Sequence, residues 1–246
     1  MGVVLVTGGS RGIGAAVVTR AAAAGWSVCL TYRGDEVAAD DLVARARHSG
    51  VDARAVRADV AVEADVEAAF AAADAMGPLA GVVVNAGVVV PKARVDAMSA
   101  QRVAEMLAVN VVGAVVTCRE AVRRLSTAHG GPGGAIVLVS SVAARLGAPG
   151  EYVDYAASKA AVDTLGTGLA KEVAGEGVRV NVVRPGIIDT GIHASGGQPD
   201  RVARIGPAVP VGRAGTADEV AAAVAWLLSD EASYCTGSVL DIAGGR

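Results

Sequence analysis

Tyr155 and Lys159 stand four residues apart in a helix-forming stretch, in a chain that has only four Tyr and three Lys. This spacing places both side chains on one face of a helix. A phenol with a pKa of about 10 exchanges protons poorly at neutral pH, but a nearby ammonium favours the phenolate and lowers that pKa. Such a pair could pass a proton to or from a carbonyl or alcohol oxygen. The alternative is an ordinary pair on a helix surface.

Polar residues at the ends of expected strands could join this pair. Ser140 and Ser141 end an apolar run that precedes the helix, so a serine hydroxyl could donate to the same substrate oxygen. Asparagine is as scarce as lysine: Asn85 ends another apolar run, Asn110 lies in an otherwise apolar helical stretch, and Asn181 is the third. A buried amide must be hydrogen-bonded, so a structural role is the alternative for each.

A glycine-rich turn follows the first apolar run and leads into an Ala-rich helix. Glycine lets the backbone turn sharply and approach a pyrophosphate, whose charge is attracted by the free N–H groups of a helix start. The spacing is T-G-x-x-x-G-x-G rather than G-x-G-x-x-G, because position 17 is Val. We predict a nucleotide cradle here, with a plain structural loop as the alternative. Its predicted residues are Gly8, Ser10, Arg11, Gly12, Ile13 and Gly14.

The end of the second apolar run is expected to choose between NAD and NADP. A carboxylate there would bind the ribose 2′-OH, whereas an Arg would pair with a 2′-phosphate. The run ends in Tyr32 and Arg33, with Arg11 in the glycine loop facing the same region. This favours NADP, with both Tyr32 and Arg33 at the cofactor. The alternative is that Arg33 is a solvated turn residue and that Asp35 or Glu36 merely caps the next helix.

The elements that must position these residues are short apolar strands alternating with Ala-rich helices. Continuous apolar strands indicate a parallel sheet buried on both faces. We therefore predict one α/β domain over residues 1–246, a doubly wound, Rossmann-type sheet of about seven strands. Ligands bind beyond the carboxyl ends of such strands. The expected strands are Val3–Thr7, Ser27–Tyr32, Ala53–Ala58, Gly81–Asn85, Ala135–Ser140, Arg179–Arg184 and Ser238–Asp241. The expected helices include Ala15–Ala24, Glu36–His48, Glu63–Ala75 and Thr216–Leu228.

Composition excludes several classes of protein. With 52% hydrophobic residues and a net charge of −3, the 246-residue chain is not a disordered one. Its scattered Arg form no basic stripe for nucleic acid. The longest apolar runs, such as Gly81–Val84, fall far short of the ~18 residues of a membrane span. The three Cys have no paired spacing, so no metal site is predicted, and without a signal peptide we expect a cytoplasmic protein.

Taken together, the motifs resemble those of the short-chain dehydrogenase/reductase family over essentially the whole chain. The matching positions are Thr7–Gly14, Asp59-Val60, Asn85-Ala86-Gly87, Asn110, Ser140-Ser141, Tyr155 with Lys159, Asn181, and Pro185-Gly186 with Thr190.

The resemblance implies roles for these residues. Tyr155 would be the general acid–base, and Lys159 would lower its pKa and hold the nicotinamide ribose. Ser141 would orient the substrate oxygen, and Asn110 would support a water-linked proton relay. Asp59 would contact adenine and Thr190 the nicotinamide end. The other cofactor-binding residues implied are Val60, Asn85, Ala86, Gly87, Pro185, Gly186 and Ile188.

Two points depart from the family or vary within it. The family commonly places its serine 13 residues before the tyrosine, whereas Ser141 lies 14 and Ser140 lies 15 before Tyr155. We expect Ser141 to be the catalytic serine, with Ser140 as the alternative. Residues 188–212 fall where the family has its variable substrate loop, in which His193 is either a substrate contact or a solvated bystander. Sugar, 3-oxoacyl and secondary-metabolite ketone substrates stay open, and few aromatics argue against a stacked sugar.

The sequence thus predicts an NADP(H)-dependent oxidoreductase acting on a carbonyl or secondary alcohol. One alternative is a catalytically silent NADP-binding sensor or scaffold of the same fold, and another is a binding module for a different nucleotide. Apolar residues around much of Ala100–Arg124 and Val153–Glu172 suggest partner helices. The family resemblance implies a homodimer or homotetramer.

Overall fold

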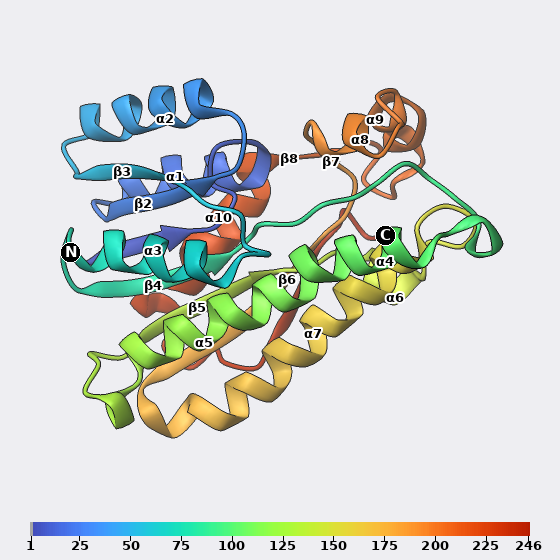
Figure 1. Ribbon diagram of the computed structural model, residues 1–246. Coiled ribbons are helices and arrows are strands. Elements are labelled where there is room, and N and C mark those ends of the chain that lie inside the picture. The colour runs from blue at the N-terminus through green and yellow to red at the C-terminus, as the bar shows by residue number, and fades with distance from the viewer. Residues whose placement is uncertain (1) are drawn as a thin grey trace.

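The computed structural model describes residues 2–246 and contains a seven-stranded, fully parallel sheet. The strand order is β3-β2-β1-β4-β5-β6-β9 (Figure 1). A separate two-stranded ribbon pairs β7 with β8. The strands are β1 (Val3–Val6), β2 (Ser27–Tyr32), β3 (Ala53–Arg57), β4 (Leu79–Val84), β5 (Gly134–Val139), β6 (Val178–Pro185), β7 (Ile188–Asp189), β8 (Gly215–Thr216) and β9 (Val239–Ile242).

Helices cover both faces of the sheet. The α-helices are α1 (Gly12–Ala23), α2 (Glu36–His48), α3 (Glu63–Asp74), α4 (Ala100–Leu107), α5 (Gly113–Leu125), α6 (Ala143–Leu146), α7 (Val153–Val173), α8 (Ile192–Ser195), α9 (Arg201–Ile205) and α10 (Ala217–Leu228). The π-helical segment η2 (Ala108–Val112) joins α4 to α5, and short 3₁₀ turns are η1 (Val95–Ala97), η3 (Thr127–His129), η4 (Ala174–Glu176), η5 (Gly206–Ala208) and η6 (Asp230–Ala232).

The apolar strands build two core layers, one on each face of the sheet. Helices α1, α2 and α10 close one layer, and α3, α5 and α7 close the other. Figure 1 shows α5 and α7 running side by side along the second face. Burial of strand residues on both faces explains their continuous apolar pattern. The strand order reverses between β1 and β4. The carboxyl ends of these two strands therefore lie at the point where ligands bind in sheets of this kind.

The predicted seven-stranded parallel sheet is confirmed, and the element bounds differ by one or two residues at most strand ends. All seven strands form one sheet, and the single domain over residues 1–246 stays a prediction. The largest difference is at the start of the first helix, which begins at Gly12 rather than Ala15. The ribbon β7–β8 and the short helices α8 and α9 were not predicted, because each is too short to show a hydrophobic period.

The stretch Ala100–Leu125 differs from the expectation that no segment could span a membrane. By length and composition alone its 26 helical residues could do so, with a mean hydropathy of 1.3 over an 18-residue window. Unbroken apolar runs miss it, because charged residues interrupt the helix. In the fold it packs against β4 and α7, and 33% of that window is buried.

Candidate active site

The glycine loop between β1 and α1 is built to leave room for a ligand. Gly8 and Gly12 have φ of +62° and +54°, a left-handed conformation that favours glycine. A Cβ at Gly14 would lie 2.4 Å from the carbonyl oxygen of Gly8, so no side chain fits there. Arg11 is the exposed N-cap of α1, and its side chain makes no capping hydrogen bond. The predicted cradle therefore fits a dinucleotide pyrophosphate at the start of α1.

Asn85 and Thr7 hold this loop in place across the reversal of strand order. The Asn85 amide donates to the carbonyls of Thr7 and Gly8 at 2.9 and 3.0 Å. The Thr7 hydroxyl accepts from the backbone N–H groups of Asn85 and Ala86 at 3.0 and 3.1 Å. The Asn85 side chain thus positions this loop, and its predicted contact with the cofactor stays a prediction.

The end of β4 joins the glycine loop to the predicted reacting centre. A Cβ at Gly8 would meet the Cα of Ala86 at 3.0 Å. One residue further on, a Cβ at Gly87 would lie 3.2 Å from the Nζ of Lys159 and 3.4 Å from the Oδ1 of Asn110. Gly87 is therefore packed against the lysine, and a larger residue would press on its ammonium.

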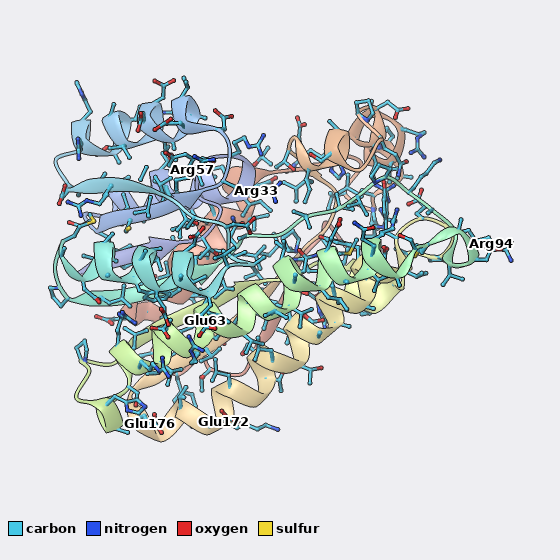
Figure 2. The ribbon with its side chains drawn as sticks, in the orientation of Figure 1. Arg33, Arg57, Glu63, Arg94, Glu172 and Glu176 are labelled. Atoms are coloured by element: carbon cyan, nitrogen blue, oxygen red, sulfur yellow. The ribbon has the colours of Figure 1, made fainter. Side chains whose placement is uncertain are left out.

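Arginines gather where the second and third strands end. Arg33 is 70% exposed in its side chain and lies 3.6 Å from the carboxylate of Asp59. Sequence reasoning missed Arg57, the last residue of β3, whose Nε donates to the Arg33 carbonyl at 3.4 Å. Figure 2 shows Arg33 and Arg57 close together beside these strands. The two guanidiniums make a cationic corner that matches a phosphate better than a bare hydroxyl.

The acidic residues that follow this corner are used within the protein. Asp35 caps α2 by accepting from the backbone N–H of Ala38 at 3.1 Å, as the alternative interpretation expected of it. Glu36 accepts from the hydroxyl of Tyr32 at 3.2 Å. Tyr32 is buried, and burial raises the pKa of its phenol. One oxygen of each carboxylate is thus engaged within the protein.

Tyr155, Lys159 and Ser141 meet at the carboxyl end of β5. Tyr155 and Lys159 occupy the first turns of α7, one helical turn apart, with Nζ 5.9 Å from the centre of the phenol ring. Lys159 is buried, and its ammonium donates to the carbonyl of Val139 at 2.8 Å. Ser141 follows β5, and its hydroxyl lies close enough to Tyr155 to lower the pKa of the phenol against the larger effect of burial. The structure thus brings together the three residues at which proton transfer is predicted.

Ser140 and Ser141 differ in burial and in their hydrogen-bond partners. Ser140 is buried, and its hydroxyl donates to the carbonyl of Lys159 at 3.0 Å. Ser141 is half-buried and accepts from the N–H of Ala143 at 3.1 Å, which turns its hydroxyl toward Tyr155. Ser140 therefore supports the helix, whereas Ser141 is placed to meet a substrate oxygen.

Burial decides the protonation of the tyrosine and lysine. Burial raises the pKa of Tyr155, and the Ser141 hydroxyl lowers it by less. Desolvation of the phenolate is the largest effect on this pKa, and that Lys159 lowers it stays a prediction. Burial also lowers the pKa of Lys159 to about 8, against which the Asp163 carboxylate raises it. At neutral pH Tyr155 is thus a phenol, ready to donate a proton.

Asn110 lies in the π-helical segment η2, where the helix opens between α4 and α5. Its Oδ1 accepts from the N–H of Val88 at 2.8 Å, and its Nδ2 donates to the Val88 carbonyl and the Ser158 hydroxyl, both at 3.0 Å. The Ser158 hydroxyl in turn donates to the Tyr155 carbonyl at 2.7 Å. Asn110 thus ties the chain after β4 to the turn of α7 that carries the tyrosine.

The chain is similar to known oxidoreductases over nearly its whole length. Residues 8–246 match the family described as enoyl-(acyl carrier protein) reductase. YgfF, an uncharacterized oxidoreductase of Escherichia coli (strain K12), is 51% identical over 100% of both chains. The 3beta-hydroxysteroid dehydrogenase 1 of Eggerthella lenta is 39% identical over 98% of this chain and 92% of that protein. The crystal structure of a short-chain dehydrogenase from Burkholderia cenocepacia J2315 in complex with NADP has a TM-score of 0.90 and 35% identity, covering 98% of this chain and 96% of that chain. The chain belongs to the short-chain dehydrogenase/reductase family.

Its relatives are named oxidoreductases and dehydrogenases, and this short-chain dehydrogenase/reductase is an enzyme of that type, acting on alcohol or carbonyl groups. Two further predicted residues follow β3, and a third, Asn181, lies in the middle of β6. Asp59 follows β3 and is half-buried, and Val60 is buried beneath α5, where a Cβ at Gly113 would lie 2.8 Å from the Val60 carbonyl. Asn181 is instead structural: its amide donates to the Cys235 carbonyl at 2.7 Å.

The predicted nicotinamide end of the enzyme follows β6. Pro185 is the last residue of β6, and Gly186 donates from its N–H to the Ile242 carbonyl at 2.9 Å. Ile188 is buried in the ribbon β7. Thr190 reaches back to the glycine loop, because a Cβ at Gly12 would lie 3.4 Å from the side chain of Thr190. These residues therefore line up from β6 toward the phosphate cradle.

The segment 188–212 is anchored to the start of α7. Tyr152, which has Ala rather than Lys four residues after it, donates from its hydroxyl to the Gly196 carbonyl at 2.9 Å. The same hydroxyl accepts from the buried Gln198 at 2.6 Å, and the Arg201 guanidinium lies 5.4 Å from the Tyr152 ring centre. His193 bonds to the Ile188 carbonyl at 2.8 Å, so it is a loop anchor rather than a solvated bystander.

Proposed function

We propose that this chain is an NADP(H)-dependent oxidoreductase that interconverts a carbonyl compound and a secondary alcohol. The observation that carries the proposal is the meeting of Ser141, Tyr155 and Lys159 at the end of β5, joined through the end of β4 to the glycine loop. The match of this chain to an NADP complex of the family supports the choice of cofactor.

The residues of the chain divide the chemistry between them. When bound, NADPH supplies the hydride. Ser141 orients the substrate oxygen, and Tyr155 gives that oxygen a proton in reduction or takes one in oxidation. The Lys159 ammonium stabilises negative charge at the phenol oxygen after the proton has left. Asn110 keeps the first turns of α7 in register with the chain after β4, through Val88 and Ser158.

We propose that the cofactor is held at three places. The start of α1, with Gly8, Gly12 and Gly14, binds the pyrophosphate, because its N–H groups and open backbone attract an anion. The cationic corner of Arg33 and Arg57 binds the 2′-phosphate. The remaining predicted contacts with the adenine and nicotinamide ends are Ser10, Arg11, Ile13, Tyr32, Asp59, Val60, Ala86, Gly87, Pro185, Gly186, Ile188 and Thr190, with Lys159 at the ribose.

The substrate is proposed to have an apolar body next to its carbonyl. Leu146 ends the short helix after Ser141, and Ile192 begins the helix after Thr190, and both side chains are exposed. Exposed apolar side chains beside a reacting centre favour an apolar ligand. A relative named as a 3beta-hydroxysteroid dehydrogenase, which takes a secondary alcohol on an apolar skeleton, agrees with this class.

The proposal is tested by following NADPH absorbance with a panel of aliphatic ketones, cyclic ketones, 3-oxoacyl thioesters and ketoses. We expect NADPH to be consumed with apolar ketones, and faster than with ketoses. Tight NADPH binding without consumption by any member of the panel would favour the silent sensor or scaffold instead. Binding of neither NADPH nor NADH would point to a module for another nucleotide.

Replacing Arg33 by Asp is expected to shift the enzyme from NADPH toward NADH. The change removes one charge-assisted bond to the 2′-phosphate and adds repulsion, so the ratio of kcat/KM for NADPH to that for NADH should fall by roughly 10²-fold. Steady-state kinetics with both cofactors measures it. Arg57→Asp should act in the same direction.

Arg94→Asp is the matched control for the Arg33 variant. Arg94 is also an exposed arginine near a carboxylate, 3.2 Å from Asp96, but Figure 2 shows it at the opposite end of the molecule. Its cofactor ratio should equal that of the wild type. An unchanged ratio of NADPH to NADH kcat/KM in both Arg33→Asp and Arg57→Asp would contradict binding of the 2′-phosphate by this cationic corner.

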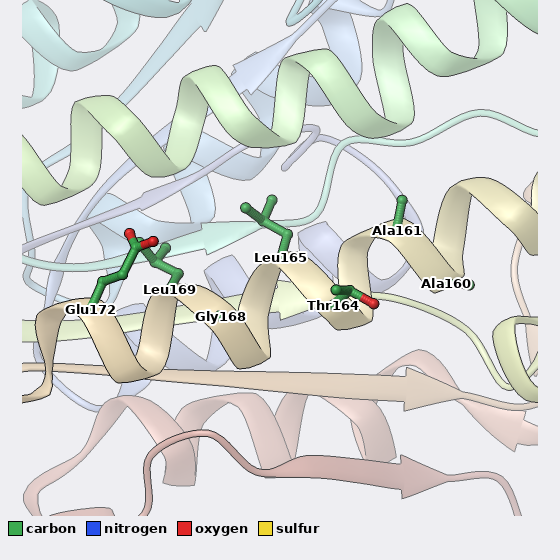
Figure 3. Close-up of a pocket in the computed structure, with 7 residues that line it drawn as sticks. All are labelled: Ala160, Ala161, Thr164, Leu165, Gly168, Leu169 and Glu172. Atoms are coloured by element: carbon green, nitrogen blue, oxygen red, sulfur yellow. The ribbon is translucent and has the colours of Figure 1, made fainter.

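We also propose that the enzyme is a homodimer or homotetramer. The face formed by α5 and α7 carries the exposed apolar side chains Val112 and Val115. A groove of about 660 Å³ runs along α7, as Figure 3 shows. Its lining residues are Ala160, Ala161, Thr164, Leu165, Gly168, Leu169 and Glu172. An exposed apolar face of this kind favours a protein partner.

Light scattering is expected to give a mass of two or four times 24.3 kDa. Val115→Lys, on this face, should lower the assembled fraction, because it buries a charge in the interface. Val37→Lys, at an exposed apolar site on α2, should leave it unchanged. A 24.3 kDa particle for the wild type would contradict the assembly.

The free thiols of Cys29 and Cys118, both buried, support the proposed cytoplasmic location.

A further inference from the structure

Behind Lys159, a line of alternating charges runs from α7 across the sheet. Asp163 lies one helical turn after Lys159, and both guanidinium contacts from Arg184 to its Oδ2 are 2.9 Å long. Arg184, near the end of β6, also lies 3.5 Å from Asp241 of β9. Asp241 in turn lies 3.5 Å from Arg145 of α6, the short helix after Ser141. The order of charges is therefore positive, negative, positive, negative, positive.

Only one of the two carboxylate oxygens of Asp163 takes part in this line of charges. Asp163 is 8% exposed, and its Oδ2 takes both bonds from Arg184. Its Oδ1 is buried and has no hydrogen-bond partner among residues 2–246. A buried carboxylate oxygen without a donor is costly unless a positive charge nearby compensates it. Besides Arg184, Lys159 is a second cation, buried and one helical turn earlier on the same helix face, although it forms no direct ion pair with Asp163.

The surroundings of Lys159 make this neighbour important. The ammonium is buried and donates to a single protein acceptor, the Val139 carbonyl, among residues 2–246. The other groups packed near it are the Tyr155 phenol on α7 and the uncharged amide of Asn110 on η2. Asp163 is thus the one carboxylate that acts on the ammonium in the part of the chain that the structure describes.

We propose that Asp163 is a positioning residue that keeps Lys159 charged at working pH, and that Arg184 tunes it by sharing the carboxylate. This inference rests on the function proposed above, because it matters only if the reaction uses the Lys159 ammonium. Burial alone favours the neutral amine, and an adjacent carboxylate restores the ammonium. Arg184 neutralises part of that carboxylate, so it acts on Lys159 with the opposite sign.

The small number of lysines makes a direct test simple. With ¹³C at the ε carbon of lysine, the chain gives three signals, and Lys159→Met identifies which one belongs to Lys159. In the wild type we expect this signal to titrate at about pH 8. In Asp163→Asn the midpoint should fall by about one pH unit, the usual size of the effect of one close opposite charge. In Arg184→Gln it should rise.

Two comparisons separate this result from a general structural change. Glu172→Gln removes an exposed carboxylate from the same helix, at the far end of the groove in Figure 3, and should leave the Lys159 midpoint unchanged. The Lys92 signal is the internal reference. Because Asp163→Asn and Arg184→Gln shift the midpoint in opposite directions, loss of structure cannot produce both results.

An unchanged or higher Lys159 midpoint in Asp163→Asn would overturn the inference. So would a lower midpoint in Arg184→Gln. The outcome is independent of the proposed function, because the titration requires no turnover. If Tyr155→Phe abolishes reduction but Asp163→Asn leaves the midpoint unchanged, only the role of Asp163 fails. If no carbonyl is reduced while the midpoint shifts as expected, the function fails and the electrostatic coupling stands.

Discussion

Tyr155→Phe is expected to lower kcat for carbonyl reduction by about 10²–10⁴-fold, the usual contribution of a positioned general acid. The phenol is the group nearest Ser141, and burial keeps its pKa above the usual value, so it holds a proton to donate at neutral pH. Phenylalanine keeps the ring and removes only the hydroxyl group. NADPH binding, measured by fluorescence titration, should be retained, because the predicted cofactor contacts lie mostly on other elements.

Tyr234→Phe is the matched control, because the Tyr234 side chain is fully exposed near the last strand. Its kcat should equal that of the wild type. If Tyr155→Phe kept full turnover, Tyr155 would not be the acid, and the assignment of the reacting centre would have to move.

Lys159→Met should reduce kcat by roughly 10²–10³-fold, the usual loss when one group that stabilises developing charge is removed. Methionine has a similar length and suits a buried site, so the protein should still fold. The wild type should also lose activity as pH rises through about 8, the pH at which Lys159 loses its proton. Above that pH the neutral amine no longer stabilises a phenolate. Steady-state kinetics across pH 6 to 10 measures both effects, a range set by the ordinary pKa of lysine.

Lys171→Met changes the other lysine of α7, which is exposed and two residues from the helix end. Its kcat and pH profile should match those of the wild type. Suppose that Lys159→Met keeps the full kcat near neutral pH and loses activity at the same alkaline pH as the wild type. The lysine would then have no part in the reaction.

The fold could be predicted well because its signals are local. Each β-strand is a short apolar run, and each long helix is an Ala-rich stretch between two runs, so burial on both faces leaves a readable pattern. The pair Tyr155 and Lys159 was predictable for the same reason, since i, i+4 spacing on a helix fixes which side chains share a face. The glycine loop was also predictable, because positive φ restricts Gly8 and Gly12 to glycine.

Contacts between distant elements were not predictable in this way. Arg57 ends a strand like any exposed residue, and only pairing of β2 with β3 brings it to Arg33. Gln198 and Tyr152 meet because a loop folds back over the start of α7. No period or motif marks such meetings, since they depend on the whole chain being folded.

The balance between burial and charge at Tyr155 and Lys159 was the second feature that could not be predicted from the sequence. The expectation that Lys159 lowers the pKa of Tyr155 follows from their spacing alone, but spacing carries no information about burial. In the structure, desolvation of the phenol outweighs the other effects on this pKa. The charge that acts against the burial of Lys159 is that of Asp163, which pairs with Arg184. Such a balance requires the depth of each group and the position of every neighbouring charge.

The most direct test of the proposed reaction is isotope transfer. The enzyme would be incubated with NADPH carrying deuterium at the transferable position of the nicotinamide, together with a ketone from the panel, and the alcohol analysed by mass spectrometry. We expect deuterium on the carbinol carbon of the alcohol, and a corresponding loss of product in Tyr155→Phe. Alcohol without deuterium, or tight NADPH binding without alcohol from any ketone, would contradict carbonyl reduction by this site.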